Sequence, residues 1–279
     1  MIEAVLHGKS LGFEYSEDIL TSTIFGTLKY LPLDSGLIPF IEDAFLYDDL
    51  RTPLWKRLNQ DGIELRCYEN IKYIFWNRHT QYGEPDLILL FTNHIHGVED
   101  FLLVIEAKFK SEKSGTGDYD QLMRYYSSVV KGVEGFSDIE ISSFKGKKGY
   151  IIYLTESEAS DEIQDSIKSI RKAEMTFNNS LFHLRWHQLY KVLVDRKNIY
   201  SNTERMIAED LMKYLERVGL REFSGVKVPD ESIVRITSIN KPIFFSNFNE
   251  EIEKSYFSEL PLVQINDCQI CFFRGNQNE

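Results

Sequence analysis

Alternating apolar and polar positions, and short apolar runs, predict a set of strands along the chain. Alternation over four to eight residues is typical of a strand with one buried face. Runs that are almost continuously apolar are typical of strands that bury both faces. The predicted strands are residues 63–68, 71–76, 86–91, 101–109, 150–154 and 182–186, with residues 93–97 as the hairpin connection between the third and the fourth.

Apolar residues that recur every three to four positions predict the helices. Ser16 is a candidate N-cap for the first helix, and the acidic Glu17 and Asp18 would suit the positive end of its dipole. Asp118 is a candidate cap for a helix after a glycine-containing connection, and Gly219 is placed to end the last helix. The predicted helices are residues 19–31, 37–46, 119–130, 161–175, 187–194 and 203–218.

The order of these elements predicts an α/β or α+β fold with a central β-sheet flanked by helices. The chain has 279 residues, 43% of them hydrophobic, which is enough for one substantial core. From residue 223 the pattern changes to short β-like runs and turns. We therefore expect a main domain over residues 1–222 and a C-terminal extension over residues 223–279, which packs on the core or offers a surface to a partner.

Composition narrows the setting of the protein. No apolar stretch reaches the roughly 18 residues that a membrane span needs, and the N-terminal residues lack the pattern of a signal peptide. Cys67, Cys268 and Cys271 do not form a disulfide framework, so we expect a reducing cytoplasm. Cys268 and Cys271 have zinc-like spacing, but no second ligand pair follows them. The formal charge of −11 argues against a broadly basic nucleic-acid surface, although a bound divalent metal would offset part of an acidic site.

Three charged residues interrupt the two most apolar strands. Asp86 begins one of them, while Glu106 and Lys108 lie two apart on the next and therefore share a face. Two carboxylates about 4 Å apart repel each other by roughly 4 kcal/mol at an effective dielectric of 20, and a cation between them turns that repulsion into binding. Oxygen ligands favour Mg²⁺ or Mn²⁺, and the Ala107 carbonyl is a further candidate ligand. The alternative is a simple ion pair on an exposed strand face.

The sequence Pro85-Asp86, followed by Glu106-Ala107-Lys108, resembles the pattern of the PD-(D/E)xK nuclease superfamily. The resemblance implies a restriction-endonuclease-like core, with a mixed central β-sheet of four or five strands between helices. It also implies metal-dependent hydrolysis of DNA phosphodiesters. It implies that Asp86 and Glu106 bind the metal and act in catalysis together with Lys108. It covers roughly residues 14–155.

A second motif resembles the RecB-like branch of this superfamily. Gln121 and Tyr125 match its Gln-xxx-Tyr pattern on the helix after the lysine strand, and their spacing puts both side chains on one helix face. The resemblance implies that Gln121 acts at the catalytic centre and contacts phosphate or base edges, while Tyr125 stacks on the substrate. This branch also carries an early helical glutamate as a metal ligand, for which Glu17 is the candidate and Asp18 the alternative. The alternative for the Gln-xxx-Tyr motif is a core tyrosine beside a solvated glutamine.

Further expectations concern the substrate and partners. Arg78 precedes Asp86 in a segment where it or His79 could contact phosphate, against the alternative of a surface position. Such nucleases often accompany a motor or helicase, so we expect a partner protein or motor subunit in a defence or repair complex, and we leave homo-oligomerisation open. A catalytically silent module that binds nucleic acid or a partner is the alternative function, and RNA cleavage is a third. The residues do not decide between endonuclease and exonuclease.

Overall fold

The computed structural model describes residues 16–47, 50–93, 98–111, 113, 115, 120–131, 133–173 and 179–221, together with two short strands near the C-terminus. Contacts divide the chain into two compact units, Met1–Ser224 and Gly225–Glu279, a division two residues beyond the boundary expected from the sequence. In the second unit, β6 (Gln264–Ile265) and β7 (Cys268–Gln269) form an antiparallel pair. Cys271, like the rest of the predicted C-terminal runs, lies outside the described residues.

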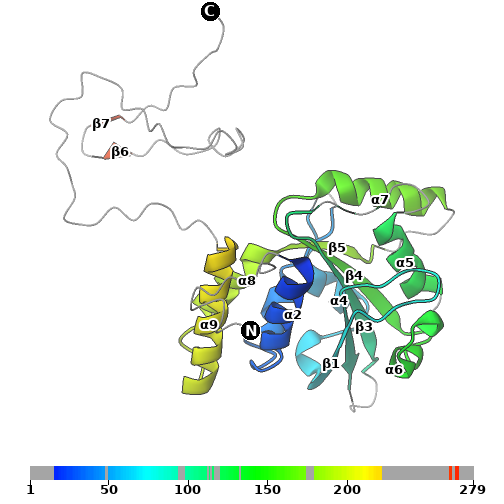
Figure 1. The fold of residues 1–279 in the computed structure, drawn as a ribbon, viewed down its shortest axis with the longest axis horizontal. Coiled ribbons are helices and arrows are strands. Elements are labelled where there is room, and N and C mark those ends of the chain that lie inside the picture. Colours follow the sequence, from blue (N-terminus) through cyan, green and yellow to red (C-terminus); the bar gives the residue numbers. More distant parts are fainter. Residues whose placement is uncertain are drawn as a thin grey trace, which may run out of the picture. The chain divides into compact units, whose positions relative to one another are not determined.

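A five-stranded mixed sheet forms the centre of the first unit, which confirms the predicted α/β class (Figure 1). Its spatial order is β1-β2-β3-β4-β5; the first three strands pair antiparallel, and the last three pair parallel. As a result, the start of β2 and the ends of the other four strands lie along the same edge of the sheet, the one that runs across the strands. The strands are β1 (Asn70–Phe75), β2 (Leu87–Thr92), β3 (Phe101–Ala107), β4 (Lys148–Thr155) and β5 (Leu181–Arg185).

Helices cover both faces of this sheet (Figure 1). Alternate residues of β3 divide between two apolar clusters: Leu103 and Ile105 pack with α2, α3, α8 and α9, whereas Leu102 and Val104 pack with α5 and α7. Every residue of β3 is buried, as its nearly continuous apolar run predicts. The helices are α2 (Glu17–Leu28), α3 (Leu37–Glu42), α4 (Leu54–Gln60), α5 (Gln121–Lys131), α6 (Ile139–Ser142), α7 (Ser160–Lys172), α8 (Trp186–Asp195) and α9 (Asn202–Val218), with 3-10 turns η1 (Leu65–Cys67) and η3 (Val133–Gly135).

Capping residues explain the ends of α9 better than the start of α2. Gly219 ends α9 in the left-handed conformation, φ 86°, as predicted. Ser201 begins the same helix, because its hydroxyl accepts from the Glu204 amide while the Glu204 side chain returns to the Ser201 amide. Ser16 is the N-cap residue of α2, as predicted, but its side chain makes no capping hydrogen bond.

Other predicted elements differ from the structure. Residues 63–68 are not a strand, because they contain the 3-10 turn η1. The strand that follows them, β1, is the outermost strand on its side of the sheet. The helices α4 and α6 were not predicted. Asp118, most of the predicted hairpin connection at 93–97 and the end of the helix predicted at 161–175 lie outside the described residues. In the described part of the chain, no helix combines the length and apolarity of a membrane span.

Candidate metal centre

Asp86 and Glu106 meet at the sheet edge because of the strand register. Leu87 pairs with Ile105 in the β2–β3 ladder, so Asp86, one residue earlier, stands opposite Glu106. The Ala107 amide donates to Asp86 Oδ2 over 2.8 Å, which fixes the position of the Asp86 carboxylate. Asp86 is 7% exposed and Glu106 1% exposed, so both charges are largely removed from water.

Lys108 connects this pair to the first helix. Its ammonium lies 2.6 Å from Glu106 Oε1 and 2.9 Å from Glu17 Oε1. The other oxygen of Glu17 accepts from the Phe109 amide at 3.1 Å and the Ser111 hydroxyl at 2.7 Å. Glu17 thus closes the site from α2, whereas its neighbour Asp18 is exposed.

The donor set fits a divalent cation. Carboxylate oxygens of Glu17, Asp86 and Glu106 lie within 4.8 Å of one another. Glu106 Oε2 is buried and has no hydrogen-bond partner among the described residues. A buried carboxylate oxygen without a partner is costly, and a cation would satisfy it. All the donors are oxygens, which matches Mg²⁺ or Mn²⁺ better than softer metals.

Burial shapes the ionisation of the centre. It raises the pKa of Asp86 to about 6, and the neighbouring carboxylates of Glu17 and Asp18 add to that rise against the Ala107 amide and Lys108, which lower it. Burial and the repulsion of Asp86 also raise the pKa of Glu106. Burial alone would lower the pKa of Lys108, but the carboxylates of Glu106 and Glu17 raise it above its ordinary value. Lys108 therefore stays protonated, while the pKa values of Asp86 and Glu106 are raised toward neutral pH.

The motif residues on α5 lie against the same edge. Gln121 Nε2 donates to the Tyr125 hydroxyl over 3.1 Å, so the two side chains share a helix face as predicted. The Tyr125 hydroxyl in turn donates to the Glu84 carbonyl over 2.8 Å, and its ring is 2% exposed. A ring this buried offers no free face to a base in this conformation, which favours the alternative of a core tyrosine, and stacking by Tyr125 on a substrate stays a prediction. Tyr125 positions the segment that carries Asp86.

Arg78 and His79 occupy the connection between β1 and β2. Arg78 is exposed, and no described contact joins its side chain to the carboxylates. His79 is buried, with its Nδ1 accepting from the Gln81 and Tyr82 amides at 3.0 and 3.2 Å, and its ring packs on Tyr82 and Phe136. His79 thus organises the loop, and phosphate contact by Arg78 stays a prediction.

A second polar cluster, which was not predicted, surrounds His183 on β5. Its Nδ1 lies 3.1 Å from the Tyr47 hydroxyl, and its Nε2 lies 2.8 Å from Thr155 Oγ1. Burial lowers the pKa of His183 to about 4, against the raising effect of Glu158. The signal in the sequence was a lone histidine between Phe182 and Leu184, inside an otherwise apolar strand.

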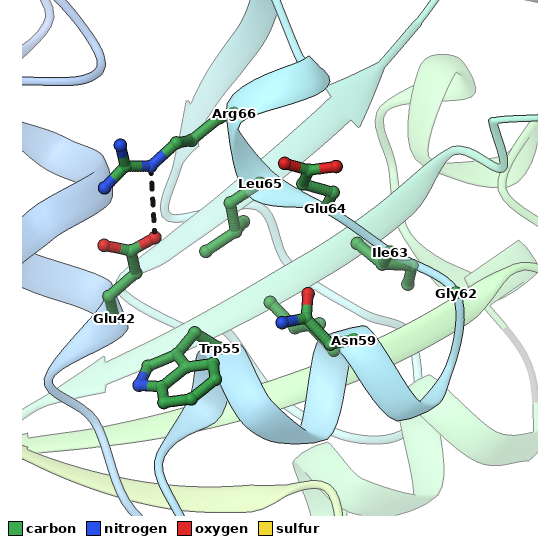
Figure 2. A pocket seen from close by; sticks show the side chains of 9 residues that line it. Glu42, Trp55, Asn59, Gly62, Ile63, Glu64, Leu65 and Arg66 are labelled. Carbon is green, nitrogen blue, oxygen red and sulfur yellow. Dashed lines mark ion pairs between the residues drawn. The ribbon is translucent and has the colours of Figure 1, made fainter.

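Two pockets lie away from the carboxylate centre. One of about 720 Å³ is lined by residues of α4 and η1, with the exposed Trp55 on its wall and the ion pair of Arg66 and Glu42 beside it (Figure 2). Next to this pocket, the Asp61 carbonyl accepts from the Lys148 ammonium at the start of β4. The pocket therefore lies at the edge of the sheet opposite to the one that carries Asp86 and Glu106. A second pocket, of about 550 Å³, lies between α3 and α8. Neither includes a residue of the carboxylate centre.

Comparison with known proteins leaves the family open. The chain is 26% identical over 211 residues to an uncharacterized protein of Pasteurella multocida (strain Pm70), an alignment that covers 69% of this chain and 70% of that protein. No protein-family model and no solved structure matches the chain. The function must therefore be argued from the site itself.

Proposed function

We propose that the protein is a divalent-metal-dependent nuclease that hydrolyses DNA phosphodiesters, a member of the RecB-like branch of the PD-(D/E)xK superfamily with a restriction-endonuclease-like core. One observation carries the proposal. Carboxylate oxygens of Glu17, Asp86 and Glu106, from three separate parts of the chain, lie within 4.8 Å of one another, and Lys108 lies beside them. Among the described residues, the buried Oε2 of Glu106 has no hydrogen-bond partner. The sequence order of these residues is that of the superfamily pattern.

The charge balance supports a divalent cation. Three carboxylates and one ammonium carry a formal charge of −3 + 1 = −2, which one Mg²⁺ or Mn²⁺ neutralises. Glu17, Asp86 and Glu106 would hold the ion, and the Ala107 carbonyl is the further ligand implied by the resemblance. When bound, such an ion polarises the scissile phosphate and lowers the pKa of a water molecule.

Lys108 and Gln121 have distinct roles in this proposal. The raised pKa of Lys108 keeps its ammonium charged, so it can stabilise negative charge that develops on the phosphoryl oxygens. Its two ion pairs also hold Glu17 and Glu106 in place before substrate arrives. Gln121 begins α5, where its amide can contact phosphate or a base edge, and Arg78 is proposed as an additional phosphate contact.

The cellular setting follows from the proposed chemistry. A DNA substrate and the absence of a disulfide framework favour the cytoplasm. We further propose that a partner protein or motor subunit supplies the DNA, as in a defence or repair complex, and that assembly with a second copy is compatible with this role.

A cleavage assay tests the function directly. Purified protein is incubated with linear DNA, circular DNA and RNA in Mg²⁺, Mn²⁺ or EDTA. We expect metal-dependent cleavage of DNA that disappears in Asp86→Ala and in Lys108→Ala. A matched control is the exposed ion pair Asp165 and Lys168 on α7, 2.8 Å apart, whose alanine variants should cleave normally.

The outcomes separate the competing functions. Cleavage of linear DNA alone indicates an end-dependent exonuclease, and preferential loss of RNA indicates a ribonuclease. Tight nucleic-acid binding without cleavage in any metal would replace the enzyme with a catalytically silent binding module. Cleavage that survives both substitutions would show that the carboxylate centre is not the active site.

A further inference from the structure

Trp76 is a large, partly exposed aromatic residue whose backbone lies beside that of Asp86. Its side chain is 39% exposed, with one contact to the Phe75 ring at 5.4 Å between centroids. Its amide donates to the Asp86 carbonyl over 3.2 Å. Because Phe75 pairs with Leu87, Trp76 stands directly opposite Asp86 in the same register. The Trp76 backbone is therefore hydrogen-bonded to the residue that carries a proposed metal ligand.

The backbone of Trp76 is held in a conformation that a bulky residue rarely adopts. Its φ is 48°, in the left-handed region that favours glycine or asparagine. The Asp86 carbonyl stabilises this turn by accepting the Trp76 amide, an interaction that any residue except proline could make. Glycine or asparagine would therefore form the same turn at a lower conformational cost. A strained, exposed aromatic at a candidate site points to a role in binding.

The proposed nuclease also needs an aromatic surface that Tyr125 does not provide. Tyr125 is 2% exposed and bonded to the Glu84 carbonyl, whereas Trp76 keeps more than a third of its surface free. Every nucleobase has an apolar face that stacks on an aromatic ring, and such stacking tolerates any base sequence. A base can use Trp76 only when it is unpaired.

We propose that Trp76 is the platform on which an unpaired base of the substrate stacks next to the scissile phosphate. This inference rests on the proposed nuclease function and names its substrate class: single-stranded DNA, or the frayed end of a duplex. Trp76 binds and orients the substrate, and the acid–base and charge chemistry stays with the carboxylates and Lys108.

The test compares two oligonucleotides that differ only in their bases. The first is an oligothymidylate, and the second is an abasic oligonucleotide of the same length, with the same phosphates. Affinities are measured by fluorescence anisotropy with Ca²⁺ in place of Mg²⁺, for the wild type, Trp76→Asn and Trp76→Phe. Asparagine tolerates the left-handed backbone, so the fold is preserved, and phenylalanine keeps an aromatic face.

We expect Trp76→Asn to bind oligothymidylate roughly 5- to 100-fold more weakly than the wild type, with little change for the abasic strand. Trp76→Phe should restore most of the difference. Trp55 provides the matched control, because it is 47% exposed but lies in the pocket at the opposite sheet edge; Trp55→Ala should bind like the wild type (Figure 2).

Two results would overturn the proposal. One is an equal loss for both oligonucleotides, or no loss at all, in Trp76→Asn. The other is the same base-dependent loss in Trp55→Ala. The proposed function is read separately, from cleavage of the oligothymidylate by the wild type in Mg²⁺. Base-dependent binding without cleavage would retain Trp76 as a stacking residue and remove only the nuclease activity, whereas cleavage with unchanged binding in Trp76→Asn would retain the nuclease and remove Trp76.

Discussion

Two buried polar clusters lie near the same edge of the sheet, and they handle burial in opposite ways. Around His183, each ring nitrogen lies within hydrogen-bond distance of a hydroxyl, and burial lowers the pKa of the ring. Around Glu106, three carboxylates gather about one ammonium, and one buried oxygen has no hydrogen-bond partner among the described residues. In the first cluster, each ring nitrogen has a hydroxyl of the protein within hydrogen-bond distance, whereas in the second a bound cation would supply the partner that the buried oxygen lacks.

This difference shows how to distinguish a structural polar cluster from a functional one. Buried polar groups are normally hydrogen-bonded, and a partly satisfied network is worse than an apolar core. The partly satisfied network near Glu106 lowers the stability of the folded protein at the place where the proposed chemistry needs charge. The two clusters should therefore respond differently to substitution, to pH and to metal.

The largest difference should appear in activity. Glu106→Gln keeps an oxygen for the Lys108 ammonium but removes the charge that would hold a cation, so we expect metal-dependent cleavage to fall by about 10³-fold. His183→Phe should stay within about threefold of the wild type, because no proposed step uses His183. Initial rates on single-stranded DNA measure both, with circular dichroism to verify folding. Comparable losses in the two variants would erase the distinction between the clusters.

Acid should destabilise the His183 cluster. The pKa of His183 is about 4 when folded and about 6.5 when unfolded, so the unfolded chain binds the extra proton between these values. Stability is fully present above pH 6.5 and is lost as the pH falls toward 4, by about 3 kcal/mol in total. Urea unfolding across this range measures the effect.

His183→Phe isolates that contribution, because phenylalanine takes up no proton. The charged groups facing the histidine, Glu158, Arg51 and Arg185, remain in both proteins, so their titration cancels in the difference. The variant should have a flatter dependence of unfolding free energy on pH over this range. If the two proteins showed the same dependence of unfolding free energy on pH, His183 would have the same pKa in the folded and the unfolded state.

Asp86 should show the reverse sign. Its pKa of about 6 lies above the unfolded value of 3.8, so the folded state binds the extra proton and stability falls as the pH rises through this window. In EDTA at pH 7.5, Asp86→Asn should therefore stabilise the protein by about 1–3 kcal/mol, while the amide oxygen still accepts from Ala107. Thermal or urea unfolding provides the measurement.

Metal should then remove most or all of the stability advantage of Asp86→Asn over the wild type. Mg²⁺ at 100 times its dissociation constant should stabilise the wild type by about 2.7 kcal/mol and leave Asp86→Asn unchanged. The wild type in EDTA is the reference for both shifts. Equal stabilisation of both proteins by Mg²⁺ would place the metal away from Asp86.

The smallest expected effect concerns the Thr155 hydroxyl, which pairs with His183 Nε2 and also donates to the Ser157 carbonyl. Thr155→Val removes the hydroxyl that pairs with His183 Nε2 and should cost about 1–2 kcal/mol in unfolding free energy, with activity preserved. Thr155→Ser keeps the hydroxyl and is the control, expected within about 0.5 kcal/mol of the wild type. A valine variant as stable as the serine variant would show that the ring nitrogen finds another partner.

The sequence predicts the buried strands better than the peripheral ones. The runs that become β2 and β3 are buried on both faces, so their apolar character alone identifies them. Residues 63–68 show strand-like alternation but lie outside the sheet, with Ile63, Leu65 and Tyr68 buried from an irregular segment that contains η1. Burial of alternate residues is a property of strands that other backbones can imitate over a few residues.

The sequence by itself determined which residues bear charge inside apolar strands, namely Asp86, Glu106 and Lys108, and the helix face shared by Gln121 and Tyr125. Periodicity is local, so it can be read along the chain. This information was enough to propose a metal-binding centre and its class of chemistry.

Only the tertiary structure decided which distant side chains join or leave that centre. It brings Glu17 to Lys108 while Asp18 stays exposed, buries the ring of Tyr125, and leaves Trp76 in water opposite Asp86. The physical reason is that strand register and helix packing set these contacts across the sheet. Neither is encoded in the spacing of residues within one element.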